Sequence, residues 1–462
     1  MDVPLGRPRK CSCTPCTLRF LHSGGTQSAF ARYDFEMGLE SPGEASDTMS
    51  TSLNISPRGI WPALIVLSVL ALLPVGRAAE APLLIGAAAG IVLAWRARAT
   101  LRSDPGVRLA VVLFACYWLA ALISAPGSVA PEKSWGTVAG LLRFVPFAVF
   151  ACLTQRDASV WPRIVAAVAM LDMLWLLDAW VQILTGYSVG GAMSSDRLSG
   201  IFGAHLRLGP MLSVLAPFVF VAARARFGWR GLLVAFVFQL MPILLAGSRA
   251  AWLMYALVTL AFVWRETRSP ARFAAACVGA AVLAALAAVV AWHASDAFDA
   301  RVQRSLLVLQ GTTQAVDEAA AGRVRIWTTA QRMIAAHPLA GIGVRAFRYA
   351  YPHYALPGDS FVGLDGDEGA MHAHQVVLEV LSETGVIGLM LWIAGAAFAI
   401  RAWIRAGATV RERALAPALA LAVMCFPLNT HLAFYSAWWG LLFWWLLALY
   451  AAALAAGDGD GA

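Results

Sequence analysis

Long hydrophobic runs separated by short polar segments recur along most of this chain. Twelve of them lie between residues 60 and 456, each 15 to 26 residues long. A helix needs about 20 mostly apolar residues to cross a bilayer, and runs this continuous lack the alternation of a β-barrel strand. The pattern predicts an all-α polytopic membrane protein with about 12 transmembrane helices, over residues 60–76, 82–96, 107–126, 136–153, 160–185, 207–223, 229–246, 250–264, 272–292, 376–400, 413–434 and 437–456.

The composition supports this interpretation. Hydrophobic residues make up 60% of the 462 residues and charged residues 13%, whereas soluble domains average about 45–50% and about 25%. These values exclude a soluble enzyme, a secreted disulfide scaffold and a disordered chain. The net charge of +8 comes from arginines in short clusters between the hydrophobic runs. We therefore expect membrane lipids, and no nucleic acid, among the partners.

The basic residues also indicate the orientation in the membrane. With both termini in the cytoplasm, the short inner loops would contain 17 arginines and the short outer loops only five basic residues. Cytoplasmic loops of membrane proteins carry such an excess of Lys and Arg. We expect a cytoplasmic N-terminal tail over 1–57, transmembrane helices 1–9 over 58–292, an outer loop subdomain over 293–375, transmembrane helices 10–12 over 376–456 and a cytoplasmic C-terminal tail over 457–462.

Two arginines stand out among the first nine runs. Arg249 follows Gly247-Ser248 on the outer side, where a helix N-terminus and a glycine turn present N–H groups to anions and a guanidinium fits phosphate oxygens. Its alternative role is interfacial, with the charge reaching toward lipid headgroups. Arg143 lies inside the fourth run, and an arginine within a span marks a functional site by default. Its alternative is a buried pair with Asp178.

The outer loops supply further candidates. Arg197 lies in one short outer loop, where a solvated side chain is the alternative. In the long loop, Arg323 begins a stretch with the apolar spacing of a helix over 322–336 that ends before Pro338. His374 lies where the long loop re-enters the membrane, and an imidazole can act as a base near neutral pH.

Three segments together, residues 247–252, 322–343 and 374–388, resemble the O-antigen ligases and polymerases of bacterial envelopes. The resemblance implies a membrane glycosyltransferase of the C-type fold class, multi-pass in the bacterial inner membrane, with its active site and loop subdomain on the periplasmic face. It also implies that Arg249, Arg323 and His374 are catalytic. Arg197 matches a looser motif of the same family.

For the ligase branch, the resemblance implies transfer of O-antigen from undecaprenyl pyrophosphate onto the lipid A-core of lipopolysaccharide. Arg249, Arg323, Arg197 and Arg143 would bind the pyrophosphate of the lipid donor, and His374 would take the proton of the acceptor hydroxyl. A single displacement of this kind inverts the anomeric configuration. We expect no cofactor and no metal.

Other interpretations remain open at this point. An O-antigen polymerase or a pilin-type oligosaccharyltransferase would share much of the same motif set. Residues 365–368, Asp-Gly-Asp-Glu, resemble a divalent-metal motif to which His372 and His374 could add ligands. A transporter of lipid-linked saccharides would be expected to show internal repeats, and we find none. A membrane scaffold without catalysis does not explain arginines and histidines on one face.

Overall fold

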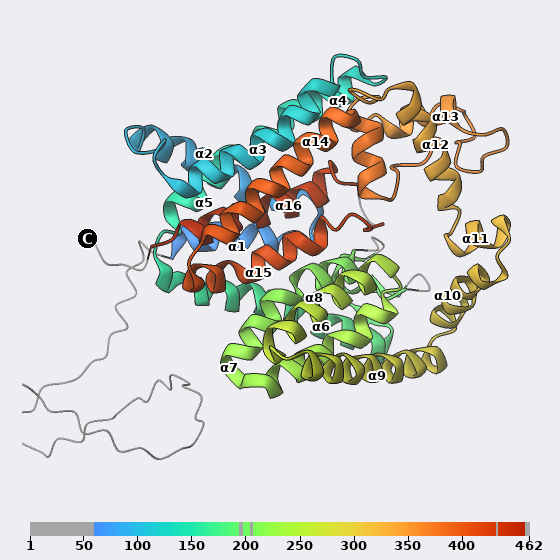
Figure 1. Cartoon of the computed structure of the whole chain (residues 1–462), viewed down its shortest axis with the longest axis horizontal. Coiled ribbons are helices and arrows are strands. Elements are labelled where there is room, and N and C mark those ends of the chain that lie inside the picture. Colours follow the sequence, from blue (N-terminus) through green and yellow to red (C-terminus); the bar gives the residue numbers. More distant parts are fainter. Residues whose placement is uncertain (1–59, 194–196, 204–206, 431–432, 458–462) are drawn as a thin grey trace, which may run out of the picture. The chain divides into compact units, whose positions relative to one another are not determined.

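The computed structural model describes residues 60–193, 197–203, 207–430 and 433–457, and almost all of their regular structure is α-helix (Figure 1). The predicted tail over 1–57 and the last five residues lie outside this range. A single two-residue hairpin, β1 (Tyr187–Ser188) with β2 (Gly191–Ala192), is the sheet in the described part. The all-α prediction is confirmed.

Every predicted hydrophobic run is occupied by a helix. Among the described residues, eight helical segments are long and apolar enough to cross a membrane, so the protein is a multi-pass membrane protein. The helices in these runs are α1 (Trp61–Ala71), α2 (Glu80–Arg96), α3 (Pro105–Ser124), α4 (Pro131–Leu141), α5 (Phe144–Thr154), α6 (Trp161–Thr185), α7 (Leu208–Leu245), α8 (Arg249–Thr267), α9 (Pro270–Ala294), α14 (Val376–Arg405), α15 (Ala408–Met424) and α16 (Ala437–Ala455).

The long helix α7 contains both the sixth and the seventh predicted run. Its backbone leaves helical geometry at Gly228, where φ is 66° and ψ is −156°. The Tyr255 ring lies against both Phe220 and Phe236, at centroid distances of 5.9 and 5.7 Å. These two phenylalanines would be about 24 Å apart along a straight helix. The chain therefore folds back at Gly228, and α7 forms two antiparallel limbs.

Helix α16 lies at the centre of the helical body (Figure 1). It packs against α3, α5 and α15, and its Trp439, Trp444 and Trp445 side chains are buried. The Trp445 indole N–H donates to the Val66 carbonyl at 2.7 Å, so a buried polar atom on this apolar helix is satisfied by α1.

Between α9 and α14 the chain forms the segment predicted as a loop subdomain. Its helices are α10 (Asp296–Leu306), α11 (Thr313–Ala319), α12 (Arg323–Ala336) and α13 (Phe347–Tyr354). A separate small core joins α12 to α13 through Ile326, Met333, Phe347 and Tyr351. The helix predicted over 322–336 is α12, and it ends before His337-Pro338 as expected.

Helix α14 is interrupted where residues 338–343 cross it. These residues are the end of the family-like segment 322–343. Gly385 has φ 66° and ψ −169°. The backbone of residues 338–343 fills the break: the Val386 N–H donates to the Pro338 carbonyl at 2.9 Å, and the Ile342 N–H donates to the Ser382 carbonyl at 2.9 Å. A broken helix is tolerated at membrane depth when protein satisfies the freed backbone groups. The motif therefore fixes the first half of α14, which follows His374.

We expect Gly341→Ala to destabilise the protein by about 2 kcal/mol or more, because its Cβ would lie 2.4 Å from the Glu383 carbonyl carbon and its φ is +71°. Gly358→Ala is the matched control, since its φ is +74° but nothing lies within 4 Å of its Cβ. The control should cost only about 1 kcal/mol. Thermal unfolding in detergent measures both, and equal losses would contradict this account of the crossing.

Candidate active site

The first residue of α8 is held by a local structure that the sequence encodes. Gly247 adopts φ +65°, and the Ser248 side chain caps α8 by accepting the Ala251 N–H at 3.3 Å. This turn leads directly into Arg249, whose guanidinium donates to the Ala319 carbonyl at the end of α11. The Gly-Ser-Arg motif thus places a solvent-accessible arginine at a helix N-terminus, in contact with the loop subdomain.

The first residue of α12 is held in a similar way. Gly322 adopts φ +75°, and the Asp317 carboxylate accepts the Val324 N–H at 3.1 Å. Arg323 then donates to the Thr430 hydroxyl at 3.3 Å. Thr430 belongs to the loop between α15 and α16, which covers Arg323 from a second side. Arg323 is therefore less exposed than Arg249.

Arg249, Arg323 and Arg197 share one electrostatic neighbourhood. Burial lowers the pKa of the Arg323 guanidinium, and the charges of Arg249 and Arg197 lower it further. Arginine nevertheless stays protonated near neutral pH. Within the described part of the chain, neither Arg249 nor Arg323 forms an ion pair with a carboxylate. The site therefore concentrates positive charge that an anion would relieve.

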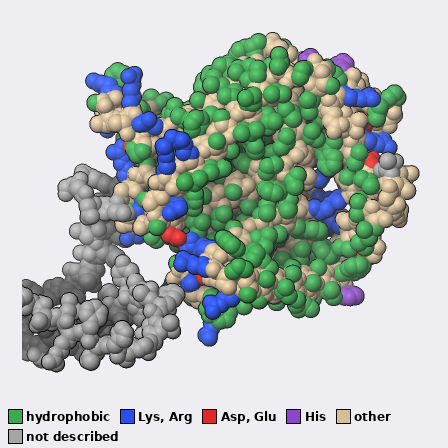
Figure 2. Space-filling view, in the orientation of Figure 1, with side chains coloured by type: hydrophobic (Ala, Val, Ile, Leu, Met, Phe, Trp, Pro, Cys, Tyr) green, Lys and Arg blue, Asp and Glu red, His purple; other side chains and the backbone are tan. Residues whose placement is uncertain are grey.

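Helix α10 adds two arginines that sequence reasoning did not single out. The guanidinium of Arg301 packs on Gly247, where a Cβ would lie only 2.5 Å from its Nη1 atom. The charge of Arg304 also acts on Arg249. We call Arg197, Arg249, Arg301, Arg304 and Arg323 the arginine cluster. Figure 2 shows Lys and Arg side chains within a hollow in this part of the molecule, between α8 and the loop subdomain.

His374 lies in a strained turn just before α14. Its φ is +53°, a region that residues other than glycine rarely adopt. The Gln375 side chain caps α14 by accepting the Leu378 N–H at 2.6 Å, and Trp327 of α12 donates its indole N–H to the Ala373 carbonyl at 3.1 Å. Backbone strain of this kind persists where surrounding contacts determine it, often at functional sites. The His374 ring also lies 3.9 Å from that of His372.

The loop between α15 and α16, described over 425–430 and 433–436 and called the 425–436 loop, contacts both the arginine side and the histidine side of the site. Gln375 donates to the Pro427 carbonyl at 2.7 Å, next to His374, and Arg323 donates to Thr430 on the same loop. Because Trp327 is one turn from Arg323 and holds Ala373, the N-termini of α12 and α14 lie close together. The structure therefore brings His374 and Arg323 to one site.

This loop corrects the prediction of a span over 413–434, since α15 ends at Met424. The break has a signal in the sequence, Pro427-Leu428-Asn429, because proline removes a helix N–H and asparagine favours turns. The buried Asn429 amide donates to the Met424 carbonyl at 3.2 Å, which caps the end of α15. His205 and His431, two further histidines expected on the outer face, lie outside the described residues.

Glu379 has a different role from the one its spacing suggests. Five residues after His374, it could have oriented the imidazole. Instead its buried carboxylate accepts the Phe434 N–H at 2.6 Å. Glu379 therefore anchors the 425–436 loop to α14 and supports the site indirectly.

Arg143 lies apart from the arginine cluster, at the junction between α4 and α5. Its guanidinium makes a bidentate ion pair with Glu80, with both N–O distances at 2.9 Å. The alternative partner considered from the sequence, Asp178, is wrong, because Asp178 accepts the Val189 N–H at 2.8 Å. Glu80, at the start of α2, therefore neutralises the positive charge of Arg143. A role for Arg143 in donor binding remains only a prediction.

The acidic motif at 365–368 is used within the loop subdomain. Glu368 pairs with Arg348 at 3.2 Å, and its backbone carbonyl accepts the Gly363 N–H at 2.8 Å. In the ranges that the structure describes, no three His, Cys, Asp or Glu side chains converge as metal ligands. The residues present therefore do not favour the divalent-metal interpretation of this motif.

Comparison with known families places the site within one family segment. Residues 234–393 match the family model described as O-antigen ligase, and this segment contains Arg249, Arg323 and His374. No curated protein matches the chain. The resemblance seen in the motifs is confirmed, and the helical membrane fold agrees with the C-type glycosyltransferases. The match supports membership of the O-antigen ligase and polymerase superfamily, whose members are glycosyltransferase-like membrane enzymes.

Proposed function

We propose that this protein, which carries an O-antigen ligase domain, moves O-antigen from undecaprenyl pyrophosphate onto the lipid A-core at the periplasmic face of the inner membrane. The observation that carries the proposal is the convergence of Arg249 and Arg323 with the turn that holds His374. These residues come from α8, α12 and the start of α14, and the three family-like motifs lie on those same elements.

The arginine cluster fits the leaving group. When the sugar–phosphate bond breaks, negative charge grows on the pyrophosphate oxygen, and cations already held in place stabilise that charge. Arg249 and Arg323 are held by the Ala319 carbonyl and the Thr430 hydroxyl and have no carboxylate partner in the described chain. Arg197 would take a further phosphate oxygen. A lipid pyrophosphate is thus an anion of suitable charge for this site.

His374 would serve as the general base. The acceptor hydroxyl gives its proton to the imidazole while its oxygen bonds to the anomeric carbon, and the electron pair of the broken C–O bond goes to the pyrophosphate. One displacement of this kind inverts the anomeric centre. A second imidazole lies beside it, because the His372 and His374 ring centroids are 3.9 Å apart.

The lipid tail of the donor would have an apolar path beside this site. A cavity of about 660 Å³ opens between α3, α14 and α15. At one end it meets Phe426, Pro427 and Tyr435 of the 425–436 loop, and from there it extends along Trp392 to Trp403. Because the same loop contacts Arg323 and Gln375, a pyrophosphate in the arginine cluster could have its polyprenyl chain in this cavity.

We expect a deletion strain to lose all O-antigen from its lipid A-core while lipid-linked polymer accumulates. Lipopolysaccharide gels and extraction of the lipid-linked saccharide measure the two quantities, and restoring the intact chain should reverse both changes. A core that carries a single repeat unit would identify a polymerase instead. Unchanged lipopolysaccharide together with altered glycosylation of pilin would indicate an oligosaccharyltransferase.

A further inference from the structure

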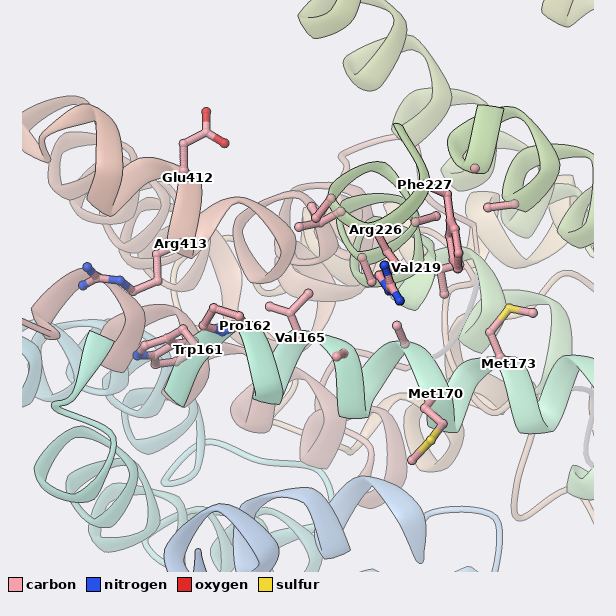
Figure 3. A pocket seen from close by; sticks show the side chains of 18 of the residues that line it. Trp161, Pro162, Val165, Met170, Met173, Val219, Arg226, Phe227, Glu412 and Arg413 are labelled. Carbon is pink, nitrogen blue, oxygen red and sulfur yellow. The ribbon is translucent and has the colours of Figure 1, made fainter. Parts of the chain in front are cut away.

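A second apolar cavity, of about 1570 Å³, lies between the first half of α6, the fold of α7 and the start of α15 (Figure 3). It is separate from the arginine cluster. Helix α8 runs from Arg249 to Thr267, a rise of about 27 Å, and at its far end Glu266 pairs with Arg224 of the α7 fold at 2.7 Å. The cavity therefore opens near the opposite membrane face from Arg249. We call it the inner groove.

The inner groove has the depth of one lipid leaflet. Its α6 wall runs from Trp161 to Met173, about 18 Å along the helix, and half of a typical hydrocarbon core is about 15 Å. Apolar lining residues are left uncovered by protein: Met170 is 61% exposed and Val234 is 66% exposed. The volume also exceeds the roughly 300–1,000 Å³ of ordinary small-molecule pockets. These features fit hydrocarbon chains.

The rim of the inner groove carries positive charge. Arg226 and Arg230 both line it, and Figure 3 shows the Arg226 side chain lying between the α7 fold and α6. Within the described residues, neither arginine forms an ion pair. Two acids also line the groove: Glu412 is paired with Arg265 at 2.6 Å, and Asp157 accepts the Ser159 N–H at 2.8 Å. Exposed Phe227 and Trp229 at the same fold are residue types common at the lipid headgroup level.

We propose that the inner groove binds an anionic glycerophospholipid of the cytoplasmic leaflet. Its acyl chains would lie along Val165 and Met170, and its phosphate would contact Arg226 and Arg230. Basic pockets between transmembrane helices at this face bind such headgroups. The arginine cluster and the inner groove lie at opposite ends of α8. A saccharide donor whose pyrophosphate is bound in the arginine cluster therefore cannot also place that pyrophosphate in the inner groove. This proposal is independent of the transfer reaction.

The experiment uses the whole protein, delipidated in a mild detergent, with phosphatidylglycerol and phosphatidylcholine as probes. Native mass spectrometry counts retained lipid, and thermal unfolding measures stabilisation. We expect the intact protein to retain phosphatidylglycerol more strongly than phosphatidylcholine. The double variant Arg226→Gln/Arg230→Gln should retain it about 30-fold less, equivalent to about 1 kcal/mol for each arginine near the lipid phosphate.

Arg272→Gln is the matched control, because Arg272 is an exposed arginine on α9 that does not line the groove. It should keep the preference for phosphatidylglycerol. Ala169→Trp should fill the apolar wall and reduce retention of both lipids, which tests the acyl-chain contact separately from charge. Equal retention of the two lipids by the intact protein, or full retention by the double variant, would overturn the proposal.

Discussion

We expect Arg323→Lys and Arg249→Lys each to reduce saccharide transfer by about 100- to 1,000-fold, the loss seen when one positioned donor to a developing oxyanion is removed. Lysine keeps the charge but loses the planar fork that binds two oxygens at once. In the unaltered protein, one guanidinium N–H of Arg323 binds the Thr430 hydroxyl and one of Arg249 binds the Ala319 carbonyl, which leaves other N–H groups of the same rigid plane for a phosphate. A lysine ammonium has no such plane. Transfer from a synthetic lipid pyrophosphate donor to purified core lipopolysaccharide measures the effect.

Arg325→Lys provides the control on the same helix. Arg325 lies two residues after Arg323, is half-exposed and pairs with Asp317 at 3.4 Å. A surface ion pair of this kind contributes little, so we expect activity close to that of the unaltered protein. Thermal unfolding of all three variants should show that they remain folded. Full activity in either Arg323→Lys or Arg249→Lys would reduce that residue to a surface charge.

The membrane helices could be predicted from the sequence because a span must satisfy all its backbone groups within itself. Each needs a continuous apolar run, and such runs are visible without knowledge of any partner. How the helices break is less visible. The fold at Gly228 separates two runs as expected, but the interruption of α14 at Gly385 depends on residues 338–343 supplying backbone partners. That crossing is a tertiary contact, and its backbone hydrogen bonds join residues 40 to 48 positions apart, such as Ile342 with Ser382 and Val386 with Pro338.

The sequence predicts several individual site residues, but it does not predict which residues contact one another. The positive-inside rule disfavours arginines in outer loops, so the sequence alone marks Arg249 as a candidate site residue. The ion-pair partner of a buried arginine is harder to predict from the sequence. Glu80 neutralises Arg143 from 63 residues away, and no local pattern indicates it. Arg301 and Arg304 were overlooked because α10 is an ordinary polar helix until it packs over Gly247.

The second large effect that we expect is a loss of about 100- to 10,000-fold in transfer by His374→Ala, the range that a general base contributes. His374 follows the loop subdomain directly, is held by the cap of Gln375 and the bond from Trp327 to Ala373, and has a backbone conformation that other contacts determine. The exposed His353 of α13 is the matched control, and His353→Ala should retain activity. Both variants should unfold at temperatures close to that of the unaltered protein.

The pH profile separates a base from a cationic ligand at this position. A base must be neutral to accept the proton, so the rate should rise with pH through the range where histidines titrate, near 6.5. An imidazolium that only binds pyrophosphate would give the opposite slope, because it loses its charge as pH rises. The anomeric configuration of the product gives independent information, since a single displacement inverts it. Near-normal transfer by His374→Ala, a falling pH profile or a retained configuration would each show that His374 is not the base.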